Sequence, residues 1–168
     1  MNHTHAHHSI NYKKGYLVLA TIILLITGLS LLSSIYLSEL KYMYFMQYFM
    51  AYFFLVFGAF KLSNLKVFAI TYSGYDLIAK RFRSYGYVYP FVEIALGLAY
   101  FFMVDGSLVN VITLILMLVG AAGVAKELSK KNRIPCACLG NIVELPLTTV
   151  SLTENLAMAG MAALMIVV

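Results

Sequence analysis

Residues 15–37 read GYLVLATIILLITGLSLLSSIYL, a run that contains no charged side chain. The hydrocarbon core of a bilayer needs about 20 apolar residues per helix, so this run is long enough to cross a membrane. Two lysines precede it, as in a secretory signal. However, the run is longer than the apolar region of a signal, and no small-residue cleavage pattern leads into a polar domain. We therefore predict a transmembrane helix.

Four further segments have the same character. Of the 168 residues, 62% are hydrophobic and 11% are charged, which is far from the composition of an ordinary soluble domain. The further spans are expected at residues 43–62, 87–104, 108–125 and 152–168. The predicted fold class is an all-α, polytopic transmembrane helix bundle over residues 15–168, and membrane lipid is its first expected partner.

The basic residues predict the orientation of the chain. With the N-terminus and residues 126–133 in the cytoplasm, eleven of the 12 lysines and arginines lie inside and only Lys41 lies outside. We therefore expect a multi-pass protein of a bacterial inner membrane with its C-terminus outside. Topology then explains the net charge of +5, which gives no reason to invoke nucleic acid.

The first 14 residues form a polar, histidine-rich tail that we predict to be disordered. Its imidazoles are His3, His5, His7 and His8. A histidine-rich tract can bind a metal ion, but a solvated tail is at least as good an interpretation, and a cloning remnant is a third.

Residues 66–86 are too charged to span a membrane and too apolar for a free loop. Lys80, Arg81 and Arg83 are mixed there with apolar side chains. This pattern indicates a helix, or a helix broken at Gly74, that lies at the membrane surface.

The span at residues 87–104 carries a carboxylate. Pro90 suits the first turn of a helix, and Glu93 follows three residues later. A carboxylate inside a span usually has a partner or a task, and Lys61 is available at the same end of the preceding span. A structural ion pair and a proton-handling acid are about equally favoured. In the last span, Ser151 and Glu154 predict a capping box at the helix start.

Cys136 and Cys138 are the only cysteines of the chain. A disulfide between them closes a very small ring, which suits exchange better than bracing. Nearby basic residues and the positive end of the last helix should lower the pKa of at least one thiol. Two thiolates can also bind a soft ion such as Cu(I) or Hg(II). Buried, inert thiols are the third alternative.

The chain resembles the MauE/DoxX-like family of redox-associated membrane proteins over roughly residues 48–168. The resemblance rests on FLVFGAFKLSNLKVF, YPFVEIALGLAYF, IPCACLGN and LPLTTVSLTENLAMAG. It implies a four-helix membrane core, to which residues 15–37 add one N-terminal span. The MauE branch is associated with maturation of methylamine dehydrogenase, whose small subunit is rich in disulfides.

The resemblance implies that Cys136 and Cys138 pass electrons as a thiol–disulfide pair, with a membrane quinone as a cofactor. Glu93 would match the acidic residue of the family motif. We therefore expect a thiol–disulfide oxidoreductase, with Lys61 and Glu93 at its site and a partner protein that carries thiols. Disulfides of exported substrates form outside, whereas the charges place this pair inside. Either the topology is inverted, or the pair handles cytosolic thiols or metal.

Two other functions remain open. One is a carrier of Cu(I) or another soft metal, using the cysteines, the histidine tail and a stripe formed by Met43, Met46 and Met50, although plain packing is favoured for the stripe. The other is an accessory subunit without chemistry.

Overall fold

The computed structural model describes residues 12–37, 42–104, 106–130 and 147–167, and the regular structure of these residues is entirely helical. In chain order, the helices are α1 (Tyr12–Leu37), α2 (Tyr42–Ser63), α3 (Leu65–Tyr72), α4 (Leu77–Arg81), α5 (Arg83–Phe101), α6 (Gly106–Ser129) and α7 (Leu147–Val167). Four of them, α1, α2, α6 and α7, are long and apolar enough to cross a membrane. The predicted fold class is confirmed, and the chain is a multi-pass membrane protein.

The third expected span corresponds to α5, which begins at Arg83 instead of residue 87. This helix is not among the four apolar ones, because Arg83, Glu93 and several tyrosines lower its hydropathy. Its status as a fifth span stays a prediction. The placement of Pro90 in the first turn was wrong, because Pro90 is the eighth residue of the helix. Proline removes one backbone hydrogen bond there, which helices inside membrane bundles tolerate.

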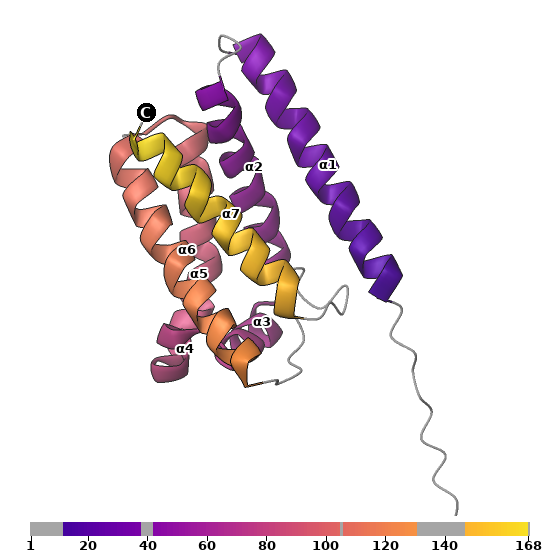
Figure 1. The fold of residues 1–168 in the computed structure, drawn as a ribbon, viewed down its shortest axis with the longest axis vertical. Helices are drawn as coiled ribbons and strands as arrows, with labels where there is room; N and C mark the ends of the chain where they lie inside the picture. The colour runs from indigo at the N-terminus through magenta and orange to yellow at the C-terminus, as the bar shows by residue number, and fades with distance from the viewer. Residues whose placement is uncertain (1–11, 38–41, 105, 131–146, 168) are drawn as a thin grey trace, which may run out of the picture.

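The long helices run alternately in opposite directions, as Figure 1 shows. Helix α2 packs along α5, α6 packs along α7, and α1 lies against the outer side of α2. The short helices α3 and α4 lie at the end of the bundle where α6 ends and α7 begins (Figure 1). We call this the basic end, because Lys61, Lys80, Arg81, Arg83 and Lys130 lie there. Whether it faces the cytoplasm stays a prediction.

The segment predicted to lie at the membrane surface is a broken helix. A turn that contains Gly74 separates α3 from α4. Asp76 begins α4, because its Oδ1 accepts hydrogen bonds from the backbone of Ile78 at 2.9 Å and of Ala79 at 2.8 Å. The sequence pattern thus predicted the break, and the surface location stays a prediction.

Helices α2 and α5 approach closely where glycine replaces a side chain. A Cβ atom on Gly97 would lie 2.9 Å from Leu55 Cγ and 3.1 Å from the Ala51 carbonyl oxygen. Nearby, Phe54 of α2 stacks on Tyr100 of α5, with ring centroids 6.2 Å apart. This contact fixes the relative height of the two helices, and so positions the charged residues that they carry at the basic end.

Candidate functional site

Lys61 and Glu93, the two charged residues predicted to lie near each other, form an ion pair and hydrogen bond between α2 and α5. The side chain of Lys61 is 12% exposed and that of Glu93 is 4% exposed. Each residue lies on the inward face of its helix, Lys61 in the last turn of α2 and Glu93 about midway along α5. The pairing predicted from the sequence is therefore present, whereas a role in proton handling stays a prediction.

Aromatic rings complete the environment of the Lys61 ammonium. Its Nζ lies 5.1 Å from the ring centroid of Tyr89 and 5.7 Å from that of Phe68. Rings at this distance attract a cation through their negative faces. Both rings are buried. The lysine is thus held by a carboxylate and two rings in a setting with little water.

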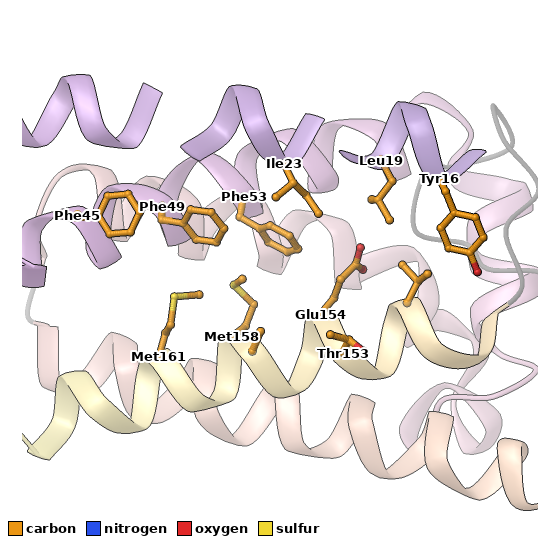
Figure 2. A pocket seen from close by; sticks show the side chains of 12 residues that line it. Tyr16, Leu19, Ile23, Phe45, Phe49, Phe53, Thr153, Glu154, Met158 and Met161 are labelled. Carbon is orange, nitrogen blue, oxygen red and sulfur yellow. The ribbon is translucent and has the colours of Figure 1, made fainter. Parts of the chain in front are cut away.

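Glu154 of α7 adds a second carboxylate to this group. The predicted capping box is wrong, because α7 begins at Leu147 and both Ser151 and Glu154 lie inside the helix. Glu154 instead turns towards α1 and α2 (Figure 2), within electrostatic reach of Lys61 and Glu93. Its Oε1 is buried and has no hydrogen-bond partner among the described residues. Helices α2, α5 and α7 therefore bring one cation and two carboxylates together.

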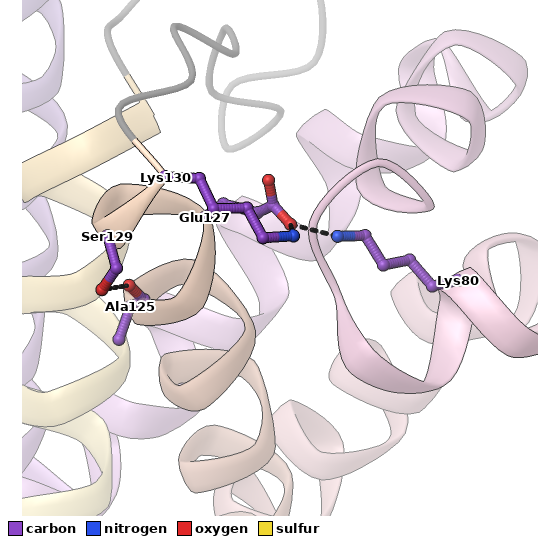
Figure 3. A network of polar contacts seen from close by, with 5 residues as sticks. All are labelled: Lys80, Ala125, Glu127, Ser129 and Lys130. Carbon is purple, nitrogen blue, oxygen red and sulfur yellow. Dashed lines mark hydrogen bonds and ion pairs between the residues drawn. The ribbon is translucent and has the colours of Figure 1, made fainter.

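A second ionic cluster lies further out at the basic end. Glu127 of α6 pairs with Lys80 of α4 and, at 3.2 Å, with Lys130 (Figure 3). Its side chain is 4% exposed, whereas those of Lys80 and Lys130 are 36% and 51% exposed. No motif in the sequence singled out Glu127. Its position seven residues after the buried Gly120 could have placed it on the inward face of α6.

Two tyrosines near the α3–α4 turn are held in the protonated form. Burial raises the pKa of Tyr72 and Tyr75 above the ordinary tyrosine value, and the neighbouring Asp76 raises both further. The Tyr72 hydroxyl donates a hydrogen bond to Asp76 Oδ2 at 3.0 Å. The turn that covers the basic end is therefore built around neutral phenols and one capping carboxylate.

A family model described as methylamine utilisation protein MauE matches residues 37–168. The chain belongs to the MauE family. Neither the curated proteins nor the solved structures with which the chain was compared gave a match. The MauE match includes Lys61, Glu93 and Glu154. It begins at Leu37, the last residue of α1, so this helix precedes the family core, as the resemblance implied.

The cysteines lie within the MauE match but outside the described residues, and the four histidines of the tail also lie outside them. Within the described part of this MauE protein, no three His, Cys, Asp or Glu side chains gather as metal ligands would. Met50 is fully buried in the core, whereas Met43 and Met46 are half-buried.

Proposed function

We propose that this MauE-family protein is a membrane thiol–disulfide relay, in which Cys136 and Cys138 exchange with the thiols of a partner protein. One observation carries the proposal. The only two cysteines of the chain lie in the sequence between α6 and α7, and the last turn of α6 and the first turns of α7 both lie at the basic end of the bundle. A positively charged setting of this kind favours the thiolate, which is the nucleophile in exchange.

The exchange transfers two electrons without another reactant. A thiolate of the partner attacks the Cys136–Cys138 disulfide, which gives a mixed disulfide and one free thiolate on this chain. The second thiol of the partner loses its proton and displaces the remaining sulfur. The partner then holds a disulfide, and Cys136 and Cys138 become thiols when they take up the two protons that the two partner thiols have released. By family, the partner is a disulfide-rich protein of methylamine utilisation.

Lys61 and Glu93 serve this exchange by handling protons. Each cysteine that is reduced takes up a proton, and each one that is oxidised releases a proton. A carboxylate and an ammonium that already share a hydrogen bond in a dry setting can pass such a proton, because a small change in their surroundings changes which group holds it.

Thiol trapping on the full-length protein in lipid nanodiscs tests the proposal. After incubation with reduced or oxidised dithiothreitol, free thiols are alkylated and the chain is weighed by mass spectrometry. Because the chain has only two cysteines, every mass change reports on this pair. We expect both thiols to be modified after reduction and neither after oxidation. A pair with the same oxidation state under both conditions would overturn the relay.

Single-cysteine variants identify the partner and exclude the rival function. Cys138→Ser should trap a mixed disulfide through Cys136 that disappears on a reducing gel, and Cys136→Ser is the matched variant for the other sulfur. Stoichiometric Cu(I) binding that is lost when both are serine, together with no change of oxidation state, would instead assign a soft-metal function.

Labelling with an impermeant maleimide, in intact cells and in inverted vesicles, decides the side of the membrane.

A further inference from the structure

A cavity of about 620 Å³ lies between α1, α2 and α7 (Figure 2). We call it the α1–α7 slot. Its volume is within the range of roughly 300–1,000 Å³ that is typical of small-molecule sites. All three helices are among the candidate membrane spans, so we infer that the slot lies at the depth of the hydrocarbon. Its occupant therefore comes from the lipid phase.

The two ends of the slot differ in polarity. Figure 2 shows Tyr16 at one end, and Thr153 and the Glu154 carboxyl between Tyr16 and the middle of the slot. Towards the other end, Phe45 and Phe49 of α2 lie across the slot from Met161 of α7 (Figure 2). The polar end lies nearer the first turns of α1 and α7, and thus the basic end of the bundle. A matching ligand has a polar head and a long apolar tail.

Glu154 indicates the chemistry of that head. Its carboxyl points into the slot, and its Oε1 is buried without a hydrogen-bond partner among the described residues. An unsatisfied polar atom in an apolar setting is costly, so a ligand atom that completes its hydrogen bonding is stabilised there. The nearby Lys61 is already paired with Glu93. The vacant hydrogen-bonding position is therefore at the polar end of the slot.

The head must also be uncharged. No lysine, arginine or histidine is among the described residues that line the slot. An anionic phospholipid head would meet the carboxyl of Glu154, and the nearby Lys61, a cation among the described residues, is already paired with Glu93, so this arrangement is unfavourable at low dielectric. A neutral ring with oxygen substituents can instead accept hydrogen bonds from the Tyr16 and Thr153 hydroxyls and from a protonated Glu154.

We propose that the α1–α7 slot binds an isoprenoid quinone, with its ring beside Glu154 and its tail along Phe45, Phe49 and Met161. This inference rests on the proposed relay, because a quinone is a neutral lipid that also takes up two electrons. The two thiols of Cys136 and Cys138 lose two electrons and two protons and become a disulfide. The quinone gains both and becomes the quinol. Glu154 accepts and returns a proton at the ring oxygen.

One wall of this site is formed by α1, a helix that lies almost wholly outside the part of the chain matched by the MauE family model. Tyr16, Leu19 and Ile23 of α1 line the slot, and α1 precedes the residues matched by the MauE model apart from its last residue, Leu37. Without α1, Glu154 would face α2 across an open groove. The added helix thus supplies a third wall for a site on one face of the family core.

The test measures binding of decylubiquinone to the full-length protein in nanodiscs by native mass spectrometry. Ala157 lines the slot, so Ala157→Phe fills it, and the matched control Leu156→Phe places the same ring on the neighbouring exposed position. We expect binding weaker by about tenfold or more for Ala157→Phe and for Glu154→Leu, and near-normal binding for Leu156→Phe and Glu154→Gln. Circular dichroism confirms that each variant is folded.

The outcomes separate this inference from the relay. Equal binding by Ala157→Phe and Leu156→Phe, or retention of phospholipid alone in the slot, overturns the quinone site even when the cysteines exchange normally. Slot-dependent binding together with cysteines that never change oxidation state supports the site and overturns the relay. Quinol formation that requires both cysteines and an unfilled slot supports both.

Discussion

Lys61 of α2 and Glu93 of α5 form a largely buried ion pair, with side chains only 12% and 4% exposed. A buried pair contributes little compared with two well-packed apolar side chains, but removal of one partner leaves a buried charge without compensation. The pair therefore makes the α2–α5 contact sensitive to single substitutions and tolerant of a matched double one.

Replacing one member of this pair should destabilise the bundle. We expect Lys61→Met or Glu93→Leu alone to lower the free energy of unfolding by about 3 kcal/mol, and the double variant to lie within about 1 kcal/mol of the wild type. Unfolding in sodium dodecyl sulfate, followed by circular dichroism, measures this. A double variant no more stable than either single variant would contradict it.

A methyl group at Gly97 should separate α2 from α5. The added Cβ would lie 2.9 Å from Leu55 Cγ and 3.1 Å from the Ala51 carbonyl oxygen, and overpacking of this kind costs about 1–3 kcal/mol. Gly160→Ala is the matched control, because nothing lies within 4 Å of its added Cβ. We expect a lower melting temperature for Gly97→Ala only. Equal melting of the two variants would refute the close contact.

Loss of the Asp76 cap should loosen α4. Asp76→Ala removes the acceptor for the amides of Ile78 and Ala79, which costs about 1 kcal/mol. Asp76→Asn keeps the cap but cannot accept the Tyr72 hydrogen bond through its amide nitrogen, so it separates the two contributions. Hydrogen exchange of the two amides should accelerate in the alanine variant and much less in the asparagine variant.

The three residues of the outer ionic cluster should contribute unequally. Because Glu127 is buried, we expect Glu127→Ala to cost about 3 kcal/mol through the contacts that it loses. Lys130 is 51% exposed, so Lys130→Ala should cost less than about 1 kcal/mol. Thermal melting at low and high salt checks the ranking, and a larger loss for Lys130→Ala than for Glu127→Ala would contradict it.

The α3–α4 turn should be sensitive to alkaline pH. Burial raises the pKa of Tyr72 above its unfolded value of about 10, so the neutral phenol stabilises the folded protein below about pH 10 and this contribution is lost as the pH rises further. We expect Tyr72→Phe to reduce the drop in melting temperature between about pH 8 and about pH 11. An unchanged drop would show that the Tyr72 phenol is not responsible.

The sequence predicted the long helices because their apolar runs match the thickness of a bilayer. It also predicted the Lys61–Glu93 contact, since both residues fall at the same end of neighbouring spans. The predicted starts of α5 and α7 were less accurate. Both helices begin several residues before the expected apolar run, because helical backbone hydrogen bonds also form in the residues that precede the run. Hydropathy alone therefore places the first residue of a helix too far towards the C-terminus.

Glu154 could not be assigned by its local motif. The spacing from Ser151 is that of a capping box, and only the packing of α7 against its neighbours shows that the carboxyl faces the slot. A signal was nevertheless present, because Glu154, Met158 and Met161 repeat at the spacing of one helix face. Periodicity over two turns was more informative here than the motif.

Because α1, α2 and α7, which bound the α1–α7 slot, are all candidate membrane spans, we expect an occupant to reach Glu154 by lateral diffusion in the bilayer, without passing through water. The occupancy of the slot therefore depends on the molar ratio of ligand to lipid, and not on the concentration of ligand in the total sample volume. In a micelle, the same protein competes for ligand with a small and finite volume of detergent. Apparent affinities will then change with detergent concentration, even though the site itself is unchanged.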